Sequence, residues 1–101
     1  MKPHEIAACV HKMFTEHPEN FCQGEFFMDG GCCTLGAATL CVNPDVDIEN
    51  FDDILPKAVV DFIYGFRCAT GRDVVSVNDI DGLPAILKGL EKMIEKGLEN
   101  E

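Results

Sequence analysis

Apolar residues recur at helical spacing in three separate stretches, and this periodicity constrains the fold more than any other feature of the chain. Residues three and four positions apart lie on one face of an α-helix, so each stretch predicts an amphipathic helix with one buried side. The predicted helices cover residues 3–17, a stretch opened by Pro56 and closed by Gly71, and residues 84–98. The apolar stripes consist of Ile6, Cys9, Val10, Met13 and Phe14, of Leu55, Val59, Phe62, Ile63 and Phe66, and of Ile86, Leu87, Leu90, Met93, Ile94 and Leu98.

The stretch NFCQGEFFMDGGCCTLGAA, residues 20–38, breaks the helical pattern with glycines, cysteines and a turn signal. Aromatic residues favour a strand, so residues 23–28 are expected to be extended. Asp29-Gly30 favours the type I′ turn of a β-hairpin, because both central residues of that turn need positive φ. We therefore expect a hairpin whose return strand begins at Cys32 and Cys33.

Two further elements complete the predicted fold. Residues 34–42 are mostly small and apolar, which predicts a short buried helix capped by Thr34 and ended by Asn43-Pro44. VVSV, residues 74–77, has the composition of a short strand. The expected fold class is α+β, with three main amphipathic helices and one short buried helix around a small antiparallel β-hairpin or sheet. Residues 1–101 are expected to form one domain.

The cysteines are an even number, which is compatible with a disulfide framework and also with free thiols. The N-terminal MKPHEIAACVHKMF carries interspersed polar residues and lacks the apolar run of a secretory signal. No apolar run approaches the roughly 20 residues of a membrane helix. We therefore expect a cytoplasmic protein whose thiols are reduced and packed inside as small apolar groups. These thiols are Cys9, Cys22, Cys32, Cys33, Cys41 and Cys68.

Acidic residues outnumber basic ones 18 to 8, for a formal net charge of −10. Direct contact with nucleic acid is not expected, because phosphates are bound by clustered lysine and arginine. Acids concentrate in DVDIENFDD, residues 45–53, which could meet a basic protein surface through its charge and an aromatic anchor. The same composition also fits a solvated loop with its aromatic residue in the core. The candidate contacts are Asp45, Asp47, Glu49, Phe51, Asp52 and Asp53.

Three short motifs occur in a recognisable order: Cys22-Gln23-Gly24, then Cys33-x-x-Gly36-Ala37, then Asn78-Asp79 before the last helix. This order resembles a family of small bacterial and phage proteins, classed as a domain of unknown function, with the pattern Trp-x-Gln-Gly, Cys-x-x-Gly-Ala and Trp-Asn-Asp. Both tryptophans are absent here, since the chain contains none. The resemblance spans most of the chain and implies a phage or bacterial origin, without implying an activity.

A cysteine nucleophile is the catalytic alternative. Cys33 is expected where a strand leads into a helix, and the N–H groups at a helix N-terminus stabilise a thiolate. A histidine would act as base, an asparagine or aspartate would orient its ring, and a glutamine would donate to an oxyanion. The bland alternative is that Cys33 only fills space. The residues of the catalytic hypothesis are Cys33, His11 or His17, Asn78 or Asp79, and Gln23.

We expect no metal and no cofactor. Structural zinc sites usually contain a Cys-x2–4-Cys turn, which is absent here, and adjacent cysteines in a strand point to opposite faces. The acidic stretch ending at Gly82 does not fit a calcium-binding loop, because Val77 and Lys88 would stand at ligand positions. The phosphate-binding pattern GxxxxGK[ST] is also absent.

The predicted function is partner binding by a small cytoplasmic protein of phage or prophage type. The partner would be a protein with a basic surface, such as a host factor or a component of a defence system, and neither nucleic acid nor membrane is expected. Gln23 and Asp79 join the acidic segment as candidate contacts. The alternatives are a cysteine-dependent hydrolase or transferase centred on Cys33, and a binder of a small molecule or nucleotide between the hairpin and the last helix.

Overall fold

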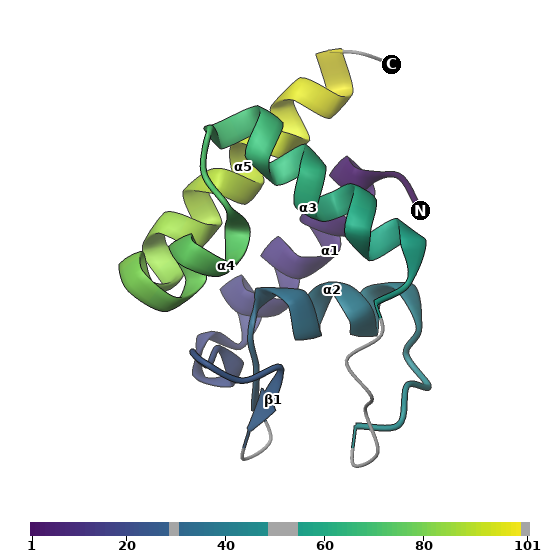
Figure 1. The fold of residues 1–101 in the computed structure, drawn as a ribbon, viewed down its shortest axis with the longest axis vertical. Helices are drawn as coiled ribbons and strands as arrows, with labels where there is room; N and C mark the ends of the chain where they lie inside the picture. The colour runs from purple at the N-terminus through teal and green to yellow at the C-terminus, as the bar shows by residue number, and fades with distance from the viewer. Residues whose placement is uncertain (29–30, 49–54, 100–101) are drawn as a thin grey trace.

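The computed structural model of the chain describes residues 1–28, 31–48 and 55–99, and most of these residues lie in helices (Figure 1). The apolar stripes predicted the main helices to within a few residues. In chain order, the elements are α1 (Pro3–Glu16), the 3₁₀ turn η1 (Pro18–Asn20), β1 (Phe27–Met28), β2 (Gly31–Cys32), α2 (Thr34–Val42), α3 (Lys57–Thr70), α4 (Val74–Ser76), the π-helical segment η2 (Val77–Asp81) and α5 (Leu83–Glu99).

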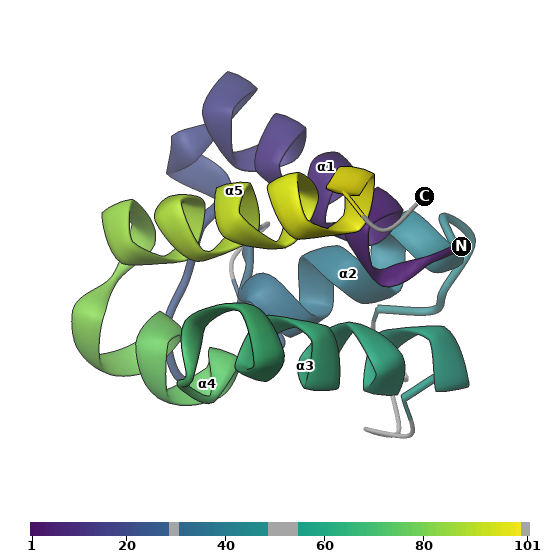
Figure 2. The same cartoon turned by 90° about the horizontal axis from the view of Figure 1, so that it is seen from above.

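The core forms around α1, which packs against α2, α3 and α5. Seen from above, α3 and α5 run along two sides of the molecule, and the start of α1 lies near the end of α5 (Figure 2). Most of the buried side chains of α1, α3 and α5 come from the stripes that the sequence predicts, and their burial contributes to the stabilising free energy. The largest fully buried side chains include Phe14, Phe62, Phe66, Ile6, Ile86 and Leu90. Within the described ranges, no helix is both long enough and apolar enough to cross a membrane.

The expected α+β class is wrong, because the chain is mainly helical. β1 and β2 contain two residues each and pair with one another, with Phe27 opposite Cys32, and Cys32 also forms an isolated bridge with Phe21. The expected strand over residues 23–28 is also too long. Gly24 has φ of +86°, which interrupts the extended backbone, and β1 begins only at Phe27. The predicted turn at Asp29-Gly30 lies outside the described residues. Among the described residues, the β1–β2 pair is therefore too small to form a sheet layer that the helices could cover.

The expected strand at residues 74–77 is helical instead. Val74 and Val77 are buried, whereas Val75 is 43% exposed, so burial recurs after three residues as on a helix rather than after two as on a strand. Asp73 starts this helix, since its Oδ2 accepts a hydrogen bond from the N–H of Ser76 at 3.4 Å. The β propensity of valine is outweighed by this cap and by the burial that the helix achieves.

Candidate functional site

Three short segments that are far apart in sequence meet beside the start of α2. They are residues 23–24, which precede β1, residues 33–34 at the N-terminus of α2, and residues 78–79 in η2. These segments include the central residues of all three motifs on which the family resemblance depends. Hydrogen bonds between them join the segment before β1, the start of α2 and η2.

The side chain of Asn78 lies at the centre of this network and is 2% exposed. Its Oδ1 accepts hydrogen bonds from the backbone N–H of Thr34 at 2.9 Å and from the Thr34 hydroxyl at 2.6 Å. Its Nδ2 donates to the carbonyl oxygen of Cys22 at 3.2 Å and to Oδ1 of Asp79 at 2.9 Å. All the usual donors and acceptors of this amide are therefore engaged within the protein.

Gln23 and Asp79 tie the segment before β1 to η2. Nε2 of Gln23 donates to the carbonyl oxygens of Asn78 at 3.0 Å and Asp79 at 3.2 Å, while the N–H of Gly24 donates to Oδ1 of Asp79 at 2.9 Å. The amide of Gln23 is thus used within the fold, and the catalytic hypothesis loses its expected oxyanion donor. Both residues hold the polypeptide in place, so we now assign them a structural role.

Cys33 is the N-cap residue of α2 and lies half-buried against this network. Its Sγ accepts a hydrogen bond from the N–H of Gly36 at 3.5 Å. Burial raises the pKa of the Cys33 thiol, although the N–H groups of Gly36 and Leu35 partly offset that effect. The helix N-terminus was expected to produce a reactive thiolate, but desolvation outweighs it here.

The histidines proposed as a base for Cys33 have partners elsewhere. Nε2 of His11, on α1, lies 3.1 Å from Oε2 of Glu91 on α5, and Nδ1 of His17 lies 3.3 Å from Oε1 of Glu19. Among the described residues, no histidine lines the cavity beside Cys33. The structure therefore brings Cys33 and Asn78 together without a base, and the Cys33–His11–Asn78 arrangement is not formed.

The cavity beside Cys33 has a volume of about 80 Å³ and is lined by Thr34 and other residues of the network, together with neighbours such as Glu25, Phe26 and Val75. Sites for drug-sized ligands and cofactors usually have volumes of several hundred Å³. Arg72, the nearest arginine in sequence to η2, forms an ion pair with Asp81. This cavity therefore does not support the prediction that the protein binds a nucleotide.

A larger groove of about 530 Å³ opens between α1, α2 and the β1–β2 pair. Most of its wall is apolar, and Ile48, which is 48% exposed, stands on the loop that follows α2. No sequence pattern reveals this groove, because its lining residues come from six separate segments and share no motif. Residues that line it include Cys9, Met13, Phe14, Phe27, Cys32, Leu40 and Ile48, with Lys12, Glu16 and His17 as ionisable neighbours.

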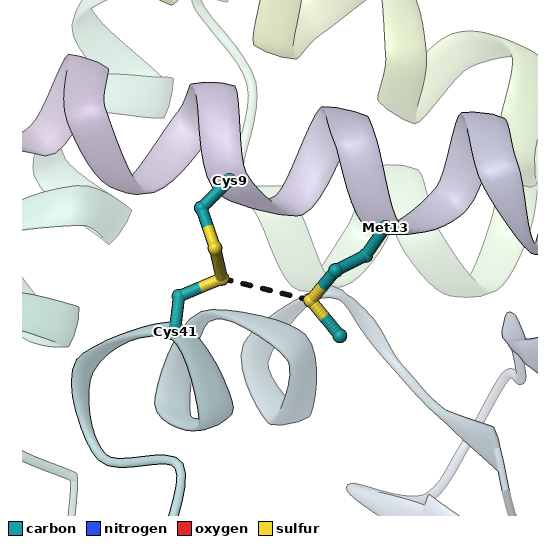
Figure 3. The surroundings of a disulfide bond; sticks show 3 residues. All are labelled: Cys9, Met13 and Cys41. Carbon is teal, nitrogen blue, oxygen red and sulfur yellow. Dashed lines mark hydrogen bonds between the residues drawn. A yellow bond between two sulfur atoms is a disulfide. The ribbon is translucent and has the colours of Figure 1, made fainter.

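A disulfide bond joins Cys9 of α1 to Cys41 in the last turn of α2 (Figure 3). The expectation that every thiol is reduced is wrong for this pair. Sδ of Met13 lies 3.6 Å from Sγ of Cys41, so three sulfur atoms gather at the edge of the groove. The expectation that every thiol is buried is also wrong, because Cys68 on α3 is exposed.

The acidic segment is only partly covered by the structure. Asp45 and Asp47 are exposed on the loop that leads to Ile48, and the N–H of Asp45 donates to Oδ1 of Asn43 at 3.2 Å. The other candidate contacts of this segment, Glu49, Phe51, Asp52 and Asp53, lie outside the described residues. Asp45 and Asp47 therefore stand beside one end of the groove rather than in the Asn78 network.

Comparisons of the chain with family models, with curated proteins and with solved structures give no match. The resemblance to the bacterial and phage family stays a prediction. The functional argument therefore depends on the geometry of the chain itself.

Proposed function

We propose that this chain is a small protein-binding module whose groove receives a cationic amphipathic segment of a partner protein. The observation that carries the proposal is the open apolar groove between α1, α2 and the β1–β2 pair, with exposed Ile48 and two exposed aspartates on the adjoining loop. An amphipathic helix that lays its apolar face into a groove is a recurring mode of peptide recognition. This proposal places the contact near the acidic segment that the sequence predicted.

Charge selects the class of partner. The protein has a formal net charge of −10, and Asp45, Asp47 and Glu16 stand at or beside the groove. A field of this sign accelerates encounter with a cationic partner and repels anionic amphiphiles such as fatty acids. Lysine and arginine residues that flank the apolar side chains of the partner would face these carboxylates. We therefore expect affinity to fall as ionic strength rises.

The family resemblance adds a setting to this proposal. It leads us to propose a phage or prophage origin, with a basic host protein as the partner. A role as inhibitor of a host factor or of a defence system follows from that setting. The groove itself supports only the binding step, and the setting adds nothing to its chemistry.

A titration with a designed peptide tests the binding step. The probe is a synthetic peptide with leucines at positions i, i+3, i+4 and i+7 and lysines elsewhere. The control peptide has the same composition with its leucines scattered, so it keeps the charge and loses the apolar face. Amide resonances of ¹⁵N-labelled protein should shift around the groove with the first peptide and much less with the second. Equal shifts with both peptides would reduce the interaction to unspecific charge attraction.

A pair of charge variants tests the electrostatic part. Asp45→Asn with Asp47→Asn removes two charges beside the groove, while Asp61→Asn with Glu95→Gln removes two exposed charges from α3 and α5. Both proteins change their net charge equally. The first should bind the amphipathic peptide more weakly than the second, and identical affinities would remove the loop from the proposal.

A further inference from the structure

The disulfide between Cys9 and Cys41 lies at the edge of the groove, and Cys9 is one of the residues that line it. Cys9 lines the groove on α1, next to Met13 one turn further along the helix. Cys41 stands in the last turn of α2, directly before the loop that carries Ile48. The bond therefore connects the two helices that bound the groove at one end (Figure 3).

The loop after α2 connects the end of this helix, which carries Cys41, to Ile48. Asn43 ends α2, since its N–H donates to the carbonyl oxygen of Thr39 at 2.8 Å. Its carbonyl oxygen accepts from the N–H of Val46 at 3.1 Å, and its Oδ1 accepts from the N–H of Asp45 at 3.2 Å. Residues 43–46 thus form a hydrogen-bonded turn directly after α2, and Ile48 follows two residues later.

The fully buried part of the core does not include this bond. Cys9 and Cys41 are half-buried, whereas the fully buried part of α1 consists of Ile6, Ala7, Val10 and Phe14. These side chains pack into one apolar core with residues of α2, α3 and α5. We expect this core to persist when the disulfide opens, because neither cysteine belongs to its fully buried part.

We infer that the Cys9–Cys41 disulfide is a redox switch on the groove, with the disulfide form as the state that binds the cationic amphipathic segment. This inference rests on the proposed function. A constrained groove loses less conformational entropy on binding than a loose one, so the disulfide form should bind more tightly. Reduction consumes two external thiols of the glutathione class: the protein S–S bond breaks, Cys9 and Cys41 each gain a hydrogen, and the two thiols are oxidised to one disulfide.

Three of the four remaining thiols are poorly suited to open this bond from within. Cys32 lines the same groove, but burial raises the pKa of its thiol to about 12. Burial also raises the pKa values of the Cys22 and Cys33 thiols. Exchange requires a thiolate, so these groups attack slowly at neutral pH, and the state of the pair follows the external thiol pool.

The affinity of the designed leucine–lysine peptide for the two states tests the inference. The oxidised protein should bind it about tenfold more tightly than the protein reduced with dithiothreitol, which lies within the usual range of coupling between two sites. Cys9→Ser with Cys41→Ser should reproduce the reduced value, and Cys68→Ser should bind like the oxidised parent. Circular dichroism of each protein, with unchanged helix content, confirms that the fold is kept.

A reciprocal measurement removes dependence on the variants. If the peptide prefers the disulfide form tenfold, linkage requires it to lower the reduction potential of the pair by about 30 mV in a dithiothreitol redox buffer. Equal affinities of both states, or tighter binding by the reduced state, would overturn the switch and leave the groove proposal intact. Absence of binding by either state would overturn the proposed function and the switch together.

Discussion

Oδ1 of Asn78 accepts two hydrogen bonds from Thr34, one from its backbone N–H at 2.9 Å and one from its hydroxyl at 2.6 Å, across 44 positions of sequence. Asn78 belongs to η2 and Thr34 is the first residue of α2, so a buried amide fixes where α2 begins. The first N–H groups of a helix have no partner within the helix, and here a distant side chain supplies one. This relationship gives the buried Asn78 amide a structural role at the start of α2.

Replacing Asn78 by alanine should lower the free energy of unfolding by about 3 kcal/mol, because buried donors and acceptors lose their partners. Urea denaturation followed by circular dichroism measures this change. Asn20→Ala, at an exposed position, should change stability by less than about 0.5 kcal/mol. A double-mutant cycle with Thr34→Val should show coupling between the two positions. A loss at Asn78 no larger than at Asn20 would contradict the structural role assigned to the amide.

Gly36→Ala should lower stability by about 2 kcal/mol, within the usual range for overpacking a core. A Cβ at position 36 would collide with the carbonyl oxygen of Phe26, which already accepts a hydrogen bond from the N–H of Cys33 at 3.1 Å and is therefore held in place. Gly65→Ala in α3 is the control, since its nearest neighbours are side-chain atoms of Met93 and Pro3 at 3.0 and 3.1 Å. Denaturation midpoints of the two variants compare them, and equal losses would refute the close approach at Gly36.

Helical periodicity predicted the helices well because their stability depends on the same apolar stripes that the sequence displays. Residues 74–77 show where that reasoning failed. VVSV has the composition of a strand, but the cap at Asp73 and the burial of Val74 and Val77 become visible only when the neighbouring helices are in place. A strand also needs a partner strand, and β1 and β2 already pair with each other.

The candidate site was predictable in part. The motif residues Gln23, Cys33, Asn78 and Asp79 gather in one network, but their hydrogen bonds give them a structural role that their identities alone did not reveal. The groove and the disulfide depend on which helix faces which. No spacing rule pairs Cys9 with Cys41 across 32 positions, so only the packing of α1 on α2 selects this pair.

Thiol labelling of the native protein should proceed in a fixed order. Cys68 is exposed and should react first with iodoacetamide, before Cys22 and Cys33, whose pKa values are raised by burial. Cys32 should react last: with a pKa of about 12, its thiolate fraction at pH 9 is about one part in a thousand. Peptide mapping by mass spectrometry measures the order at several pH values. Fast labelling of Cys33 near pH 6 would restore the nucleophile hypothesis.

Removal of the disulfide should lower the free energy of unfolding by about 4 kcal/mol. In the chain-entropy account, a bond across a separation of 32 residues restricts the unfolded chain by roughly this amount. Thermal denaturation of the oxidised protein and of Cys9→Ser with Cys41→Ser compares the two states, with Cys68→Ser as the control. An unchanged melting temperature would show that the bond adds nothing to stability, and an intact mass lacking the loss of two hydrogens would show that it does not form.

The most direct test of the central claim is the affinity of the leucine–lysine peptide for two isoleucine variants. Ile48→Asp places a charge on the wall of the groove, whereas Ile80→Asp places the same charge on η2, where Ile80 is 75% exposed and does not line the groove. Both variants change the net charge equally, and a charge at position 48 would attract the cationic peptide at least as strongly as one at position 80, so weaker binding by the first variant reports the loss of apolar contact. We predict that Ile48→Asp weakens binding about tenfold while Ile80→Asp changes it by less than about twofold. Equal affinities of the two variants would contradict the groove as the binding site.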